Sequence, residues 1–104
     1  MATVRFSRRA KADLFSIGAY TLQTWGAAQA KRYLASLEHC AKLLAGNPSL
    51  GRHCEWIRPG LRRFEKERHV FLYRLEGDGI LVSRILHQST LPEQQPFGDL
   101  DPHA

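Results

Sequence analysis

The sequence has few cysteines, no long apolar run and no low-complexity segment. Only two cysteines, Cys40 and Cys54, occur in 104 residues, so a disulfide framework is not implied and a reduced protein is the default expectation. No apolar run approaches the roughly 20 residues that cross a bilayer. Residues 1–5 lead directly into a β-prone segment and contain no apolar signal core. These absences predict a cytoplasmic protein without a membrane anchor.

Patterns that carry chemistry are also scarce. The five histidines do not fall into the paired short spacings of zinc sites, so we expect no metal. Neither cysteine lies in a nucleophile motif, and Cys40 is expected to fill a helix core instead. The segment Gly77-Asp78-Gly79 lacks the third glycine of a phosphate loop and precedes a strand rather than a helix. The sequence therefore predicts no cofactor and no obvious catalytic centre.

What the chain has in excess is arginine. Fifteen lysines and arginines face ten acidic residues, which gives a net charge of +5, and 11 of the 15 are arginines. A basic protein favours acidic partners, and the planar guanidinium suits carboxylates or phosphates better than lysine does. The alternative, that the charge serves only solubility, stays open at this point.

Two amphipathic helices are predicted in the first half of the chain. Ser7 is a plausible N-cap, because its hydroxyl can accept a bond from an amide of the first turn. The first helix has one buried face, and Gly26 is expected to end it. Its face consists of Ala10, Leu14, Ile17 and Thr21. A second stripe, which ends at Gly46 before Asn47-Pro48, consists of Ala30, Tyr33, Leu34, Leu37, Ala41 and Leu44. The short connection predicts an antiparallel helical hairpin.

Strand-like segments lie on both sides of this hairpin. Thr3–Phe6 is β-prone, residues 47–60 are expected to form a loop, and Gly77-Asp78-Gly79 is typical of a β-hairpin turn. Three strands are predicted after the loop, at residues 61–66, 68–76 and 80–87. The fold class is therefore α+β, in the order β-α-α-β-β-β, with the helical hairpin packed on a small, mainly antiparallel sheet. We expect residues 1–89 to form a single domain and residues 90–104 a loose C-terminal tail.

Five arginines lie in or near the predicted sheet. They are Arg58, Arg62, Arg63, Arg74 and Arg84. Arg74 and Arg84 stand within apolar strands, where a guanidinium must find an acceptor or reach the surface. Two interpretations remain open for them: an internal ion pair or a stem that reaches solvent, and an exposed basic face that binds carboxylates or phosphates.

Several segments, taken in order, carry a resemblance to a known family. They are Ser7-x-x-Ala10-x-x-Asp13-Leu14-x-x-Ile17-x-x-Tyr20 with Trp25-Gly26, Ala30-x-x-Tyr33-x-x-x-Leu37, Asn47-Pro48-x-x-Gly51-Arg52, Arg58-Pro59-Gly60-Leu61-Arg62-Arg63, His69-Val70-Phe71-Leu72-Tyr73-Arg74 and Arg84-Ile85-Leu86-His87. From about residue 3 to residue 88 the chain resembles ParE-type toxins of the RelE/ParE toxin–antitoxin superfamily. Each segment alone is weakly specific, and their common order and spacing make the resemblance specific.

The resemblance implies a function that composition and spacing do not. It implies the toxin of a type II toxin–antitoxin pair, which traps DNA gyrase so that chromosome replication stalls. It also implies a cognate ParD-like antitoxin, whose C-terminal segment wraps the toxin in a hetero-oligomer. On this interpretation the chain is not an enzyme and makes no direct sequence-specific contact with nucleic acid. The five arginines above are then expected to donate to carboxylates of the antitoxin.

The sibling branch of the superfamily supplies the alternative. RelE-like toxins share the fold and are ribosome-dependent mRNA endonucleases, which need acid–base groups and cations for the phosphate. Here His87 is the only acid–base candidate at the end of the last strand, and no aromatic residue follows it. Val70 and Leu72 stand where such nucleases often carry a basic residue. The sequence therefore favours a gyrase inhibitor over a nuclease, and a binding module without toxicity is the third option.

Overall fold

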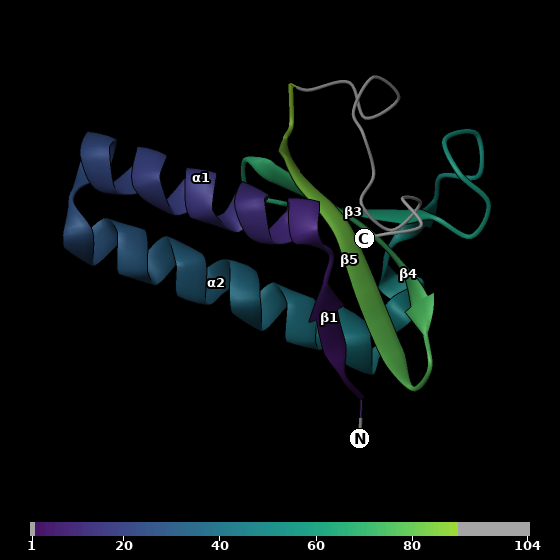
Figure 1. Cartoon of the computed structure of the whole chain (residues 1–104). Helices are drawn as coiled ribbons and strands as arrows, with labels where there is room; N and C mark the ends of the chain where they lie inside the picture. Colours follow the sequence, from purple (N-terminus) through teal and green to yellow (C-terminus); the bar gives the residue numbers. More distant parts are fainter. Residues whose placement is uncertain (1, 90–104) are drawn as a thin grey trace.

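Two helices pack on one face of a five-stranded sheet in the computed structural model, which describes residues 2–89 (Figure 1). The elements are β1 (Val4–Phe6), α1 (Arg8–Trp25), α2 (Ala27–Gly46), the 3₁₀ helix η1 (Pro48–Leu50), β2 (Arg52–His53), β3 (Arg62–Lys66), β4 (His69–Glu76) and β5 (Gly79–His87). The predicted α+β class and element order are confirmed. The prediction of a loop over residues 47–60 is wrong in part, because η1 and the short strand β2 lie within it. The predicted tail, residues 90–104, lies outside the described residues.

The sheet order is β1-β5-β4-β3-β2, and only the pairing of β1 with β5 is parallel. The long hairpin of β4 and β5 forms its centre. One irregularity interrupts their pairing: Leu72 lies opposite Arg84, but Tyr73 lies opposite Val82. Ser83 is therefore the extra residue of a β-bulge, and the pairs on its two sides differ in register by one residue.

The sheet carries a hydrophobic cluster on each face. The larger cluster joins the helices to the sheet and is centred on Leu37, Leu44, Phe71, Tyr73 and Val82. The smaller one lies under the segment between β2 and β3 and consists of Cys54, Leu61, Val70, Leu72 and Leu86. β4 and β5 therefore bury apolar side chains on each of their two faces, as central strands covered on both sides do. Neither helix of the described region combines the length and the apolarity needed to cross a membrane.

The corner between β1 and α1 completes the edge of β5. The Ser7 hydroxyl accepts the Ala10 N–H at 3.0 Å, as predicted for an N-cap, and donates to the Ser83 carbonyl at 2.7 Å. Farther along α1, the Asp13 carboxylate accepts the Ile85 N–H at 2.9 Å. Since β1 ends at Phe6, these two side chains of α1 and its cap supply the partners that a longer β1 would have supplied.

The two ends of the helical hairpin differ in how much they pack against the sheet. We call residues 8–17 and 37–46 the near end, because most of the helix residues in the larger cluster come from these segments. Residues 18–36 form the far end, where the helices project beyond the sheet on the left of Figure 1. Gly26 joins the two helices with a φ of 92°, a conformation that favours glycine. The far end therefore has the hairpin's own packing but little support from the sheet.

Candidate partner-binding site

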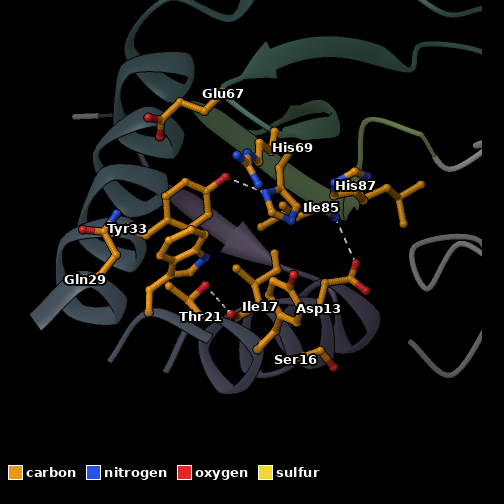
Figure 2. Close-up of a pocket in the computed structure, with 14 residues that line it drawn as sticks. Asp13, Ser16, Ile17, Thr21, Gln29, Tyr33, Glu67, His69, Ile85 and His87 are labelled. Carbon is orange, nitrogen blue, oxygen red and sulfur yellow. Dashed lines mark hydrogen bonds between the residues drawn. The ribbon is translucent and has the colours of Figure 1, made fainter. Parts of the chain in front are cut away.

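A groove of about 600 Å³ separates the hairpin from the ends of β4 and β5 (Figure 2). We call it the hairpin–sheet groove. Its lining comes from both helices, from the β3–β4 turn and from the two central strands, and includes Ile17, Tyr20, Trp25, Tyr33, His69 and His87. Elements from both halves of the chain thus meet at one surface, which the fold alone brings together.

Aromatic side chains of α1 border this groove and face solvent. Tyr20 is 64% exposed and Trp25 62% exposed, although both are large and largely apolar. Below them Ile17 and Ile85 provide an apolar surface. Exposed aromatic residues beside an apolar floor are typical of surfaces that bind another protein, since they bury much area at low entropic cost.

A polar cluster closes one side of the groove. The Tyr33 hydroxyl and His69 Nδ1 share a hydrogen bond of 2.5 Å, which Figure 2 shows as a dashed line. The rings of His69 and His87 meet edge to face with their centroids 5.7 Å apart. Burial lowers the pKa of His69, and the neighbouring His87 lowers it further. Burial raises the pKa of Tyr33, and the charge of Glu67 adds to this effect. Both shifts favour the neutral form of the group.

His87, the acid–base candidate of the sequence, lies at the exposed end of β5. Its Nδ1 is 2.8 Å from the Ser89 hydroxyl and accepts the Ser89 N–H at 3.2 Å. The sequence argument did not single out His69 or Tyr33, because they lie on other elements. The strand register pairs His69 directly with His87, and Tyr33 reaches them from α2. The histidine that seemed isolated in the sequence therefore belongs to a cluster of three groups.

The five predicted arginines do not form one cluster. Arg63 and Arg84 both lie opposite Leu72 in the strand register, and Arg74 follows Leu72 by two residues on β4. Residues in such positions share one side of a sheet, here the side of the smaller cluster, away from the helices. Arg62 points the other way and donates to the Gly51 carbonyl at 2.7 Å. Arg58 belongs to the segment between β2 and β3.

Arg84 has an internal carboxylate partner. Its Nε and Nη2 atoms donate to the two oxygens of Asp13 at 2.8 and 2.9 Å, and both side chains are nearly buried, at 10% and 14% exposure. Of the two interpretations left open by the sequence, the internal ion pair describes Arg84. Arg63 in turn lies 2.9 Å from Glu65, which also binds Arg52 at 2.7 Å. Burial alone would raise the pKa of Glu65, but the charges of these two arginines lower it.

Among residues 2–89 no three histidine, cysteine, aspartate or glutamate side chains are grouped so that they could hold a metal ion. Cys40 and Cys54 are both buried, in the two different clusters on opposite faces of the sheet. Burial raises the pKa of both thiols. Cys40 is core filler, as predicted. The groups that remain for function are those of the hairpin–sheet groove and of the arginine-bearing side of the sheet.

Comparison with known proteins gives consistent matches over most of the chain. The profile of a family described as "ParE toxin of type II toxin-antitoxin system, parDE" matches residues 4–92. Toxin ParE1 of Mycobacterium tuberculosis (strain H37Rv) is 42% identical over 83 residues, covering 79% of this chain and 85% of the relative. Toxin ParE1 of Caulobacter vibrioides is 42% identical over 89 residues, covering 86% and 92%. Toxin ParE of Escherichia coli is 37% identical over 89 residues, covering 85% and 86%.

A solved structure shares the fold. A chain of the chromosomal ParDE TA system from P. aeruginosa superposes with a TM-score of 0.71 at 24% identity, covering 84% of this chain and 96% of that one. At this identity the likeness bears on the architecture alone. It agrees with the helical hairpin on a five-stranded sheet described above.

Proposed function

Because the chain belongs to the ParE toxin family of type II toxin–antitoxin systems, we propose that it inhibits DNA gyrase in the cytoplasm and is neutralised by a cognate antitoxin. The observation that carries this proposal beyond family membership is the hairpin–sheet groove, with Tyr20 and Trp25 exposed beside an apolar floor. Such a surface suits a partner protein better than a small substrate. In this proposal the toxin acts by binding, not by catalysis.

The antitoxin is proposed to be a ParD-like protein that covers two surfaces in a hetero-oligomer. Its apolar side chains would enter the hairpin–sheet groove, and its carboxylates would meet arginines of the sheet. The candidates remain Arg58, Arg62, Arg63, Arg74 and Arg84. Arg63 is about a quarter exposed on the side of the sheet away from the helices, where it also binds Glu65. Arg84 is the least suited, because Asp13 already binds its guanidinium.

An affinity measurement tests the arginine assignment. Replacing both Arg63 and Arg74 with alanine should weaken antitoxin binding, since each charge-assisted bond contributes about 1.5–3 kcal/mol. The matched control replaces the exposed Arg32 of α2, whose only hydrogen bond among the described residues is to Gln29. Equal antitoxin affinity of the double variant and this control would show that the arginines have been misassigned.

Gyrase inhibition is tested with purified components. Stoichiometric toxin should block supercoiling or increase gyrase-dependent DNA cleavage, and added antitoxin should reverse the effect. No change in either assay at a stoichiometric amount would exclude gyrase as the target. The same assays with the antitoxin complex alone give the background.

One observation favours the second candidate, a ribosome-dependent mRNA interferase. The groove brings two imidazoles, His69 and His87, and the Tyr33 hydroxyl to one place, with Arg68 on the same lining. Acid–base groups beside a cation are what RNA cleavage requires. If this activity exists, His87→Ala should abolish toxicity while the fold is kept. In our proposal, toxicity survives this substitution.

A further inference from the structure

A second groove lies between the two helices and has no residue of the sheet in its lining. It measures about 700 Å³, and we call it the outer groove. Its walls are Phe15 and Leu22 of α1 and Leu34 of α2. Phe15 is 79% exposed and Leu22 53% exposed, so two large apolar side chains on one helical stripe face solvent. The core does not use this stripe.

Small residues form the floor of the outer groove. They are Gly18, Ala19, Ala27, Ala28 and Ala30. At Gly18 an added Cβ would lie 3.1 Å from a methyl group of Leu34, so the glycine lets the two helices approach closely. A low floor between two apolar walls accepts the side-chain ridge of a third helix, which is a recurring mode of protein recognition.

The two grooves lie on different sides of α1. Tyr20 lines the hairpin–sheet groove and Leu22 lines the outer groove. Side chains two residues apart on an α-helix point roughly 160° away from each other, because each residue turns the helix by about 100°. A segment that fills the hairpin–sheet groove therefore leaves the outer groove open.

The surroundings of the outer groove are cationic. Lys31 belongs to its lining, and Lys11 stands one turn before Phe15 on the same stripe of α1. Within residues 2–89 neither lysine forms an ion pair. Asp13 is the only acidic residue between residues 2 and 37, and it is bound to Arg84. This contrasts with Arg52 and Arg63 on the sheet, which share the carboxylate of Glu65.

We propose that the outer groove binds the protein that the toxin poisons, through a helix whose apolar stripe is flanked by carboxylates. The inference rests on the toxin function proposed above, and it gives the target and the antitoxin separate surfaces. The apolar walls favour a protein over DNA, because a phosphate backbone would neutralise the lysines but leave Phe15 and Leu22 uncovered. The charges orient the incoming helix and speed its association.

Charge reversal on matched sides of the same helices tests the proposal. The groove variant carries Lys11→Glu and Lys31→Glu, and the control carries Arg9→Glu and Arg32→Glu, which lie on other sides of the same two helices. All four side chains are exposed, so both variants should keep the fold, as circular dichroism will verify. The groove variant should need about tenfold more expressed protein to arrest bacterial growth, whereas the control arrests growth like the parent chain. A neutral variant, Leu22→Ser, should act in the same direction.

The other outcomes overturn the inference. Growth arrest by the groove variant equal to that of the control shows that the outer groove is not the target surface. A loss of affinity for the cognate antitoxin, measured on the purified groove variant, assigns the groove to the antitoxin instead. Binding of a linear DNA duplex that the groove variant alone loses assigns it to DNA. The readout of this test is growth arrest and not gyrase inhibition. A parent chain that arrests growth without inhibiting gyrase would therefore refute the gyrase proposal, while the comparison of the two variants would still test the outer groove.

Discussion

The near and far ends of the helical hairpin are built from the same two helices, but their side chains differ in burial and in polar pairing. At the near end, polar groups are paired inside the chain: Ser7 caps α1 and Asp13 binds both Arg84 and the edge of β5. At the far end, Tyr20, Trp25 and Leu22 are more than half exposed. The buried residues of the far end are Thr21 and Ala30.

This difference separates folding from binding along one supersecondary unit. The buried residues of the near end form the hydrophobic core with β4 and β5, so substitutions of these residues should change the free energy of unfolding. The exposed residues of the far end contribute little to that core, so their substitution should change partner binding while leaving stability intact. The following predictions test this separation, from the largest expected effect to the smallest.

Asp13→Ala should give the largest loss of stability. The substitution removes the two carboxylate oxygens that bind the nearly buried Arg84 guanidinium, and with them the partner of the Ile85 N–H. Breaking a buried ion pair from one side costs about 3–5 kcal/mol. Urea unfolding measures this loss, and Glu76→Ala is the control, because it breaks an ion pair with the exposed Arg5 that contributes at most about 1 kcal/mol. Equal losses in the two variants would contradict the role of Asp13.

A pair of leucines compares the two ends directly. Leu37→Ala empties a fully buried position of the near end and should cost about 3 kcal/mol of unfolding free energy. Leu22→Ala removes the same atoms at the far end, where half the side chain is exposed, and should cost less than about 1 kcal/mol. Growth arrest is measured alongside: reduced toxicity of Leu22→Ala at unchanged stability supports the division, and similar unfolding losses would refute it.

Tyr73→Phe should have an intermediate effect at the base of the near end. The Tyr73 hydroxyl donates to the Pro48 carbonyl at 2.6 Å and accepts the Gly51 N–H at 2.8 Å, so it fixes the turn after α2. Removing it leaves a buried donor without a partner and should cost about 2 kcal/mol. Tyr33→Phe, which loses one bond at the far end, should cost about 1 kcal/mol or less. The reverse order in thermal unfolding would contradict this ranking.

Much of this architecture could be predicted because it depends on local pattern. The helical stripes, the cap at Ser7 and the stop at Gly46 are all set within a few residues of sequence, and the structure places them where the sequence did. The turn at Gly77-Asp78-Gly79 likewise fixed the pairing of β4 with β5. The strand β2 was missed, because two exposed residues paired with an edge strand leave no periodic signal.

The site depended on features that no local pattern shows. If the pairing of Glu76 with Gly79 is extended without interruption, His69 lies opposite Leu86; the bulge at Ser83 moves it opposite His87. A one-residue bulge in an apolar strand has no sequence marker here, so the histidine pair could not be predicted. The partner of Arg84 was equally hidden, because Asp13 lies 71 residues away and only tertiary packing brings it close.

The last prediction concerns His69 of β4, which bonds Tyr33 of the far end and whose protonation opposes folding. Burial and His87 lower its pKa below the ordinary value near 6.5, outweighing the opposite effect of Asp13 and Glu67. Below that ordinary value the unfolded chain binds a proton that the folded chain does not, so stability falls as the pH drops through about 6.5 toward the lowered pKa.

Thermal unfolding between pH 7.5 and 5.5 should therefore show a smaller acid-induced loss of stability for His69→Gln than for the parent chain. His39→Gln, at an exposed position of α2, is the control for a histidine-to-glutamine change. An unchanged acid-induced loss in His69→Gln would show that other groups cause the acid sensitivity. A smaller loss in His69→Gln alone would show that protonation of His69 contributes to it.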